Sequence, residues 1–182
     1  TLDAVVDAQP DRISLYSYAH LPQLFKAQKL IDATQLPSDQ EKLSLLELSI
    51  EHLRGAGYEY IGMDHFARAE DELVKARECG QLQRNFQGYS THAYCDLVSL
   101  GASAIGNVAN SFYQNEKNTN AYCERVNEKR LPIVRGMSLD HDDIVRAFVI
   151  QRLMCQGRLV RHEVEVVHGI DFDDYFAWEL SA

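Results

Sequence analysis

The chain of 182 residues carries 27 acidic and 18 basic side chains, so its formal net charge is −9. This balance argues against a surface for nucleic acid or for an anionic membrane, because phosphates attract clustered lysine and arginine. The composition, with 46% hydrophobic residues, is that of a globular protein with a core. No apolar run has the length of a membrane-spanning helix, and the N-terminal segment lacks the features of a signal peptide. We therefore expect a cytoplasmic protein with no nucleic-acid or membrane partner, in which a local basic pocket binds any anionic ligand.

The chain has four cysteines, which lie far apart. Cys79, Cys95, Cys123 and Cys155 are separated by 16, 28 and 32 positions. Zinc and iron–sulfur sites are usually built from closely spaced cysteines, so the spacing predicts no metal site. A globular protein of this size does not need a disulfide framework either. We expect four buried or idle thiols.

The first half of the chain alternates helix and strand patterns. Residues 2–10 are typical of the end of a helix, and residues 12–20 and 58–66 are rich in aromatic and β-branched side chains, which favours strands. Between these two runs, residues 38–55 predict an amphipathic helix. The order strand, helix, strand favours a βαβ unit with parallel pairing.

The limits of two helices are marked by local signals. Ser38 followed by Glu41 is a capping box, and Gly55 ends the apolar stripe that follows it. That stripe consists of Leu43, Leu46, Ile50 and Leu53. A second helix, within residues 138–157, begins with an acidic first turn and carries apolar residues on more than one face. We expect the second helix to be well buried.

The later half of the chain has a different character. From residue 85 onward short apolar runs are broken by Gly, Ser and Asn, and helical patterns dominate from Glu116 to the end. We therefore predict an α/β fold with two domains, residues 1–84 and residues 85–182, of which the second is mainly helical.

Asp64 and His65 follow a predicted strand, where parallel α/β folds gather their ligand-binding groups. A structural role is the alternative, with Asp64 as a helix cap or turn acceptor and His65 as a half-buried, hydrogen-bonded ring. From the residues alone the structural role is favoured.

The segment Gln83–Thr91 gathers polar side chains around a glycine. Arg84 offers a bidentate anion clamp, Gln87 offers an amide, and Gly88 permits close approach of the backbone. The alternative, a polar surface turn, is favoured when the segment is taken alone. The glycine-containing run from Ser99 to Asn107 lacks the GxGxxG spacing and is a weak nucleotide motif.

Taken together, several segments occur in a recognisable order. They are "YSYAHLP" from residue 16, "GYEYIGMDHFARAEDEL" from residue 57, "QRNFQGYST" from residue 83, "LGASAIG" from residue 100 and "FYQN" from residue 112. In this order they resemble the oxygen-independent coproporphyrinogen III oxidases, which are radical S-adenosylmethionine enzymes of haem biosynthesis. The resemblance is strongest from Arg12 to Gly157.

The resemblance implies a fragment that contains the last strands of a partial (β/α) TIM-like barrel and part of a mostly helical C-terminal domain. Family members are more than twice this long, and the CxxxCxxC motif that binds their 4Fe-4S cluster is absent from this sequence. We therefore expect the fragment itself to be inert and to bind neither the cluster nor S-adenosylmethionine. The whole enzyme would use both cofactors and an electron donor to convert coproporphyrinogen III into protoporphyrinogen IX.

The resemblance also implies roles for individual residues. It places the backbone at Ala19 and at Ile105 against S-adenosylmethionine, and Gln87 near the substrate cavity. Asp64 and His65 become candidate catalytic residues with unassigned roles, and Arg84 and Arg68 become candidate partners of the substrate propionates. Two alternatives remain, namely a non-catalytic haem or porphyrin carrier related to the oxidase and a plain interaction domain.

Overall fold

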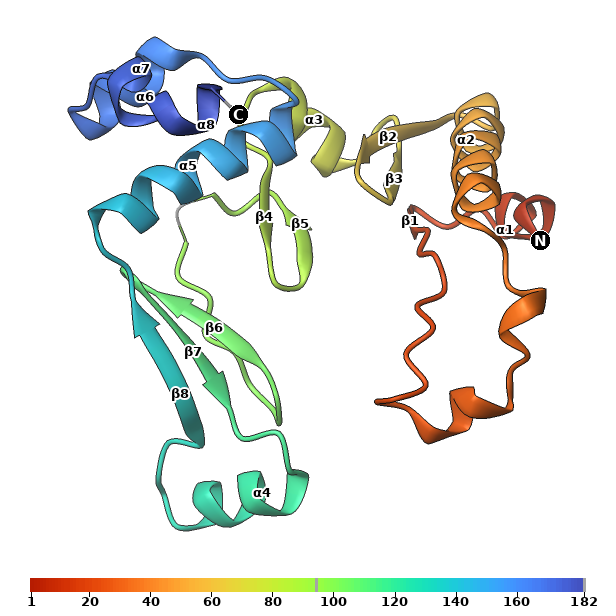
Figure 1. Ribbon diagram of the computed structural model, residues 1–182, viewed down its shortest axis with the longest axis horizontal. Coiled ribbons are helices and arrows are strands. Elements are labelled where there is room, and N and C mark those ends of the chain that lie inside the picture. Colours follow the sequence, from red (N-terminus) through yellow and green to blue (C-terminus); the bar gives the residue numbers. More distant parts are fainter. Residues whose placement is uncertain (94, 182) are drawn as a thin grey trace. The chain divides into compact units, whose positions relative to one another are not determined.

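A computed structural model of the chain describes residues 1–93 and 95–181. The chain folds as two units, Thr1–Cys79 and Gly80–Ala182 (Figure 1). Both units combine helices with strands, and this mixed content confirms the predicted α/β class. The division into domains 1–84 and 85–182 of a larger enzyme stays a prediction.

The first unit contains a sheet in the order β1 (Arg12–Ser14), β3 (His65–Arg68), β2 (Tyr58–Gly62). Both neighbouring pairs are antiparallel. The predicted parallel pairing is therefore wrong, because the chain reverses after β2 and β3 inserts between β1 and β2. The predicted strand at residues 12–20 is also too long, since regular pairing ends at Ser14.

Helices and short 3₁₀ turns complete the first unit. The predicted capping box of α2 (Asp39–Gly55) is confirmed, with the Ser38 hydroxyl accepting from the Glu41 N–H. Leu53 of α2 packs with Tyr58 and Phe66 in a buried cluster, which fixes the helix on the sheet. The remaining elements are α1 (Leu2–Asp7), η1 (Lys26–Leu30), η2 (Ala33–Gln35) and α3 (Glu72–Glu78).

The second unit begins with a hairpin of β4 (Gln83–Asn85) and β5 (Gly88–Ser90), followed by a sheet in the order β6 (Ile105–Val108), β7 (Ser111–Asn115), β8 (Ile133–Ser138). The helix α4 (Thr119–Asn127) lies in the connection from β7 to β8 (Figure 1). We expected helices to dominate after Glu116, and this expectation missed β8. The strand pairs with β7 at the edge of the three-stranded sheet.

After β8 the chain is helical. The helices are α5 (His141–Gln156), α6 (Arg161–His168), α7 (Phe172–Tyr175) and α8 (Ala177–Ser181). Val145, Val164, Phe172 and Phe176 form the buried cluster that joins α5, α6 and α7. The N-terminus of α5 is capped by Asp140, and Gly157 ends the helix in the left-handed conformation with φ 65°.

The expectation that α5 is well buried is wrong in this structure. Val145 is fully buried, but Ile150 and Leu153 are 57% and 50% exposed. Within residues 1–93 and 95–181, no helix combines the length and the apolar character needed to cross a membrane.

Candidate functional site

Asp64 and His65 form a close pair at the turn between β2 and β3. The Asp64 Oδ1 lies 2.7 Å from the His65 Nδ1, and the two side chains are 22% and 14% exposed. The Asp64 carbonyl accepts from the Leu15 N–H at 2.8 Å, and the ring of Tyr16 stands edge-on to the imidazole. The carboxylate thus orients the imidazole, and the segment after β1 holds the turn.

The same turn contains a constrained backbone. Met63 has φ 51°, an uncommon value for a residue with a side chain, and its carbonyl accepts from the Tyr60 hydroxyl at 2.5 Å. Burial and the neighbouring charge of Asp64 raise the pKa of Tyr60. Tyr60 therefore stays a neutral donor and fixes the turn that presents the Asp64–His65 pair.

Arg68 ends β3 and already has an acidic neighbour. Its Nε donates to the Glu70 carboxylate at 3.3 Å, and its backbone N–H donates to the Asp11 carbonyl. The Arg68 side chain is 38% exposed. A substrate carboxylate at Arg68 would compete with Glu70, so this residue is a weaker candidate than Arg84.

Gln28 bonds the backbone of Ala19 and of Leu21 with the two ends of its amide. The Gln28 Nε2 donates to the Ala19 carbonyl at 3.1 Å, and the Leu21 N–H donates to the Gln28 Oε1 at 2.5 Å. Gln28 is half-buried, whereas Ala19 is exposed. The amide acts as a short strand partner and fixes a segment that has no regular secondary structure.

The β4–β5 hairpin presents Arg84 and Gln87. The Gln87 N–H donates to the Asn85 Oδ1 at 2.8 Å, and Gly88 has φ 123°, which only glycine adopts readily. The predicted loop is therefore a defined hairpin turn with Gln87 exposed at its tip. The guanidinium carbon of Arg84 lies 5.5 Å from the centre of the Tyr89 ring, so a cation–π contact orients it.

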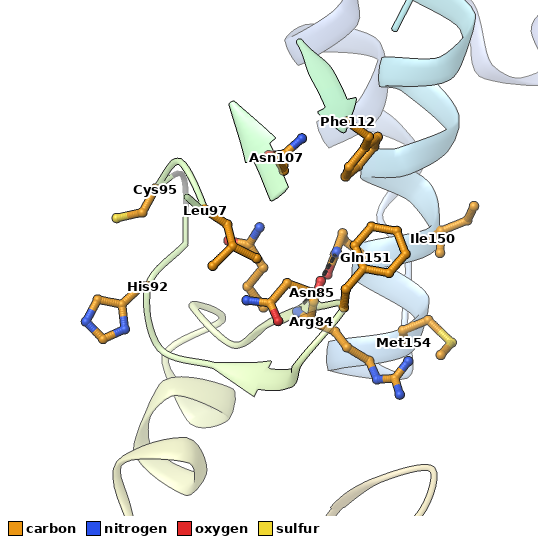
Figure 2. A pocket seen from close by; sticks show the side chains of 12 residues that line it. Arg84, Asn85, His92, Cys95, Leu97, Asn107, Phe112, Ile150, Gln151 and Met154 are labelled. Atoms are coloured by element: carbon orange, nitrogen blue, oxygen red, sulfur yellow. Dashed lines mark hydrogen bonds between the residues drawn. The ribbon is translucent and has the colours of Figure 1, made fainter. Parts of the chain in front are cut away.

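The Arg84 Nε is buried and has no hydrogen-bond partner among the described residues. Arg84 lines a pocket of about 310 Å³ between the hairpin, α5 and the start of the β6–β7 sheet (Figure 2). In Figure 2 a dashed line joins Gln151 of α5 to Arg84, and His92 and Cys95 point away from the other lining side chains. None of the residues that line the pocket is acidic, so the pocket suits an anionic group on an apolar body.

A second pocket of about 310 Å³ lies beside Ile105. Phe86 and Phe112 line both pockets, and their rings meet edge to face with centroids 5.5 Å apart. This aromatic pair is a shared wall between the Arg84 side and the Ile105 side of the second unit.

Buried polar side chains shape the loop before Ile105. Asn115, only 3% exposed, donates its amide to the Ser99 carbonyl at 3.2 Å and to the Gly101 carbonyl at 3.0 Å. The Ser99 hydroxyl donates to the Ile105 carbonyl. The Asn115 N–H donates to the Ala104 carbonyl, so by alternation the polar backbone groups of Ile105 point away from β7. A backbone edge is thus held in place at Ile105.

The described residues do not provide a cluster site. Within residues 1–93 and 95–181, no group of three or more His, Cys, Asp or Glu side chains could hold a metal ion. Cys79, Cys95 and Cys123 are exposed and Cys155 is buried, all four as free thiols. Burial raises the pKa of Cys155 to about 11, so this thiol is poorly suited to be a metal ligand.

Sequence reasoning missed several residues that support the candidates. Gln28 and Gln151 fix the backbones of Ala19 and Arg84, but they lie far from them in the sequence and carry no motif. Asn115 ends the segment "FYQN", and a polar residue at the end of an aromatic strand is a sequence signal for a buried hydrogen-bonding role.

Comparison with known proteins identifies relatives over the whole chain. No family model matches it. The chain is 49% identical over 177 residues to the oxygen-independent coproporphyrinogen III oxidase of Pseudomonas aeruginosa. This alignment covers 97% of the chain and 38% of the relative. It is 46% identical over 181 residues to the enzyme of the same name from Salmonella typhimurium, covering 100% of this chain and 40% of the relative.

One solved structure has the same fold. Coproporphyrinogen III oxidase (HemN) from Escherichia coli, described as a radical SAM enzyme, matches with a TM-score of 0.94 and 44% identity. The match covers 100% of this chain and 42% of that chain. The chain therefore spans about two fifths of the length of these relatives, and over its whole length it is homologous to the C-terminal part of the oxygen-independent coproporphyrinogen III oxidases.

Proposed function

We propose that the chain is part of an oxygen-independent coproporphyrinogen III oxidase. The whole enzyme would remove the carboxyl groups of two propionates of coproporphyrinogen III oxidatively and leave vinyl groups, giving protoporphyrinogen IX. The observation that carries this proposal is the identity of 49% to the Pseudomonas oxidase over 97% of the chain. The site residues, Asp64, His65, Arg84 and Gln87, belong to the segments on which the resemblance rests.

Two cofactors are implied, a 4Fe-4S cluster and S-adenosylmethionine. When bound, they would supply the radical chemistry of the reaction, and the protein would supply orientation and protection. The described residues do not fit the cluster, so it would have to be held by another part of the enzyme. They do fit a backbone contact to S-adenosylmethionine, because Gln28 fixes the Ala19 backbone and the Ser99–Asn115 network fixes the Ile105 edge.

The side chains of the chain would bind and orient the substrate. Arg84 suits a propionate, because its Nε is buried without a hydrogen-bond partner in the described part of the chain and its pocket contains no carboxylate. Gln87 can donate and accept at once from the tip of the hairpin. The Asp64–His65 pair provides an oriented imidazole as a candidate catalytic group. Arg68, which pairs with Glu70, is the weakest of the proposed contacts.

An anaerobic assay of the full-length protein tests this function. The protein is reconstituted with iron and sulfide and supplied with S-adenosylmethionine, a reductant and coproporphyrinogen III. We expect protoporphyrinogen IX as the product, measured as the porphyrin after oxidation, and no product without S-adenosylmethionine. Tight binding of porphyrin or haem without turnover would favour the related carrier instead.

Other predictions about the whole enzyme remain proposals. We propose that it acts in the cytoplasm, that an electron donor serves it, and that it has no nucleic-acid or membrane partner. Fractionation of cells and reduction assays with candidate donor proteins test these points.

A further inference from the structure

Arg135 of β8 is oriented by a buried neighbour on β7. Its Nε donates to the Gln114 Oε1 at 2.8 Å, and the Gln114 Nε2 donates to the Ser103 carbonyl at 2.9 Å. Gln114 is only 8% exposed, and the two residues are direct cross-strand partners. Because both ends of the Gln114 amide are bonded, the guanidinium is held in one orientation.

The rest of the Arg135 guanidinium is available for a ligand. With Nε bonded to Gln114, the two Nη atoms keep their end-on edge, which matches the two oxygens of a carboxylate. Arg135 forms no ion pair with an acidic residue in the described part of the chain. The chain contains 27 acidic residues, and most other arginines in the described part form an ion pair with one of them. The arginines with acidic partners are Arg12, Arg68, Arg77, Arg130, Arg146, Arg152 and Arg161.

Arg135 lines the pocket that contains Ile105. The residues that line it include Phe86, Phe112 and Met137, and none of them is acidic. Arg135 is exposed on β8, so a ligand can reach its guanidinium. Phe86 and Phe112 also line the Arg84 pocket, so Arg84 and Arg135 line two pockets that share this aromatic pair.

We propose that Arg135, oriented by Gln114, binds a carboxylate of a ligand in the oxidase. This inference rests on the proposed function and adds a second basic contact to the one at Arg84. The carboxylate belongs either to a propionate of the porphyrinogen or to the methionine part of S-adenosylmethionine, and the two sources are separated by experiment.

The test uses Arg135→Gln in the full-length enzyme, with Arg158→Gln as the matched control. Arg158 is an exposed arginine of the same unit that lines neither pocket. We expect Arg135→Gln to raise one KM by about tenfold, because an end-on pair of charge-assisted hydrogen bonds is lost. A rise in the KM for coproporphyrinogen III assigns the propionate, and a rise in the KM for S-adenosylmethionine assigns its carboxylate. Two unchanged KM values in an active enzyme would overturn the inference and leave the proposed function intact.

Two further measurements keep the test decisive. If Arg135→Gln lowers the melting temperature, Arg135→Lys keeps the charge but loses the bond to Gln114, and it should raise the same KM by a smaller factor. Binding of coproporphyrin III and of its tetramethyl ester by the wild-type protein provides a readout without turnover. A wild-type protein that neither turns over the substrate nor binds the free acid contradicts the proposed function and this inference together.

Discussion

Gln151 of α5 bonds both polar backbone groups of Arg84 in β4. The Arg84 N–H donates to the Gln151 Oε1 at 3.0 Å, and the Gln151 Nε2 donates to the Arg84 carbonyl. The side chain therefore completes the edge of the hairpin as a neighbouring strand would. Through this contact the helix fixes the base of the turn that carries Gln87.

We expect Gln151→Leu to loosen the hairpin, because it leaves two backbone groups of Arg84 without partners at a cost of about 1–3 kcal/mol each if they stay dry. Hydrogen exchange at the Arg84 amide should become faster by about tenfold or more. Gln151→Glu keeps the acceptor but loses the donor, so its effect on that amide should be smaller. Equal exchange in all three proteins would show that the hairpin holds itself.

His65→Ala should lower turnover of the full-length enzyme by at least about tenfold if the oriented imidazole contacts substrate or cofactor. His52→Ala is the matched control, because His52 also pairs with an aspartate, Asp3, at 3.2 Å in the same unit. The control should stay within about twofold of wild type. Similar losses for both variants would point to general destabilisation, and the melting temperatures would reveal it.

Cys155 should resist alkylation in the folded enzyme. Its side chain is 3% exposed, and burial raises its pKa to about 11, so little thiolate forms at pH 8. Modification by iodoacetamide should be on the order of a hundredfold slower than at the same residue in urea. Mass spectrometry of the Cys155 peptide measures both rates, and equal rates would contradict the burial of this thiol.

Local signals in the sequence predicted the features that depend on neighbouring residues. The Ser38–Glu41 capping box was found, because cap geometry links residues three positions apart. The reversal of the chain after β2 was not predicted, because Met63 takes a positive φ without being glycine. The insertion of β3 between β1 and β2 likewise depends on tertiary contacts and leaves no local pattern in the sequence.

The sequence named candidate residues, whose roles stay predictions, but it did not reveal the side chains that support them. Asp64, His65, Arg84 and Gln87 came from recognisable segments. Their supports act across the chain. The amide of Gln28 reaches a backbone 9 residues away, Gln114 meets Arg135 across 21 residues, and Gln151 meets Arg84 across 67. Such bonds depend on the folded arrangement, so spacing in the sequence cannot reveal them.

The role of the β4–β5 hairpin in the oxidase is tested most directly by Gln87→Ala in the full-length enzyme. Gln87 is exposed at the hairpin tip, so its removal should leave the circular-dichroism spectrum and the melting temperature unchanged. We expect turnover of coproporphyrinogen III to fall by at least about tenfold, roughly 1.4 kcal/mol of transition-state stabilisation, because positioning of the reactants is lost. Gln81→Ala, an exposed glutamine just before β4, should keep full activity. A stable and fully active Gln87→Ala enzyme would contradict the account, because the hairpin would then take no part in the reaction.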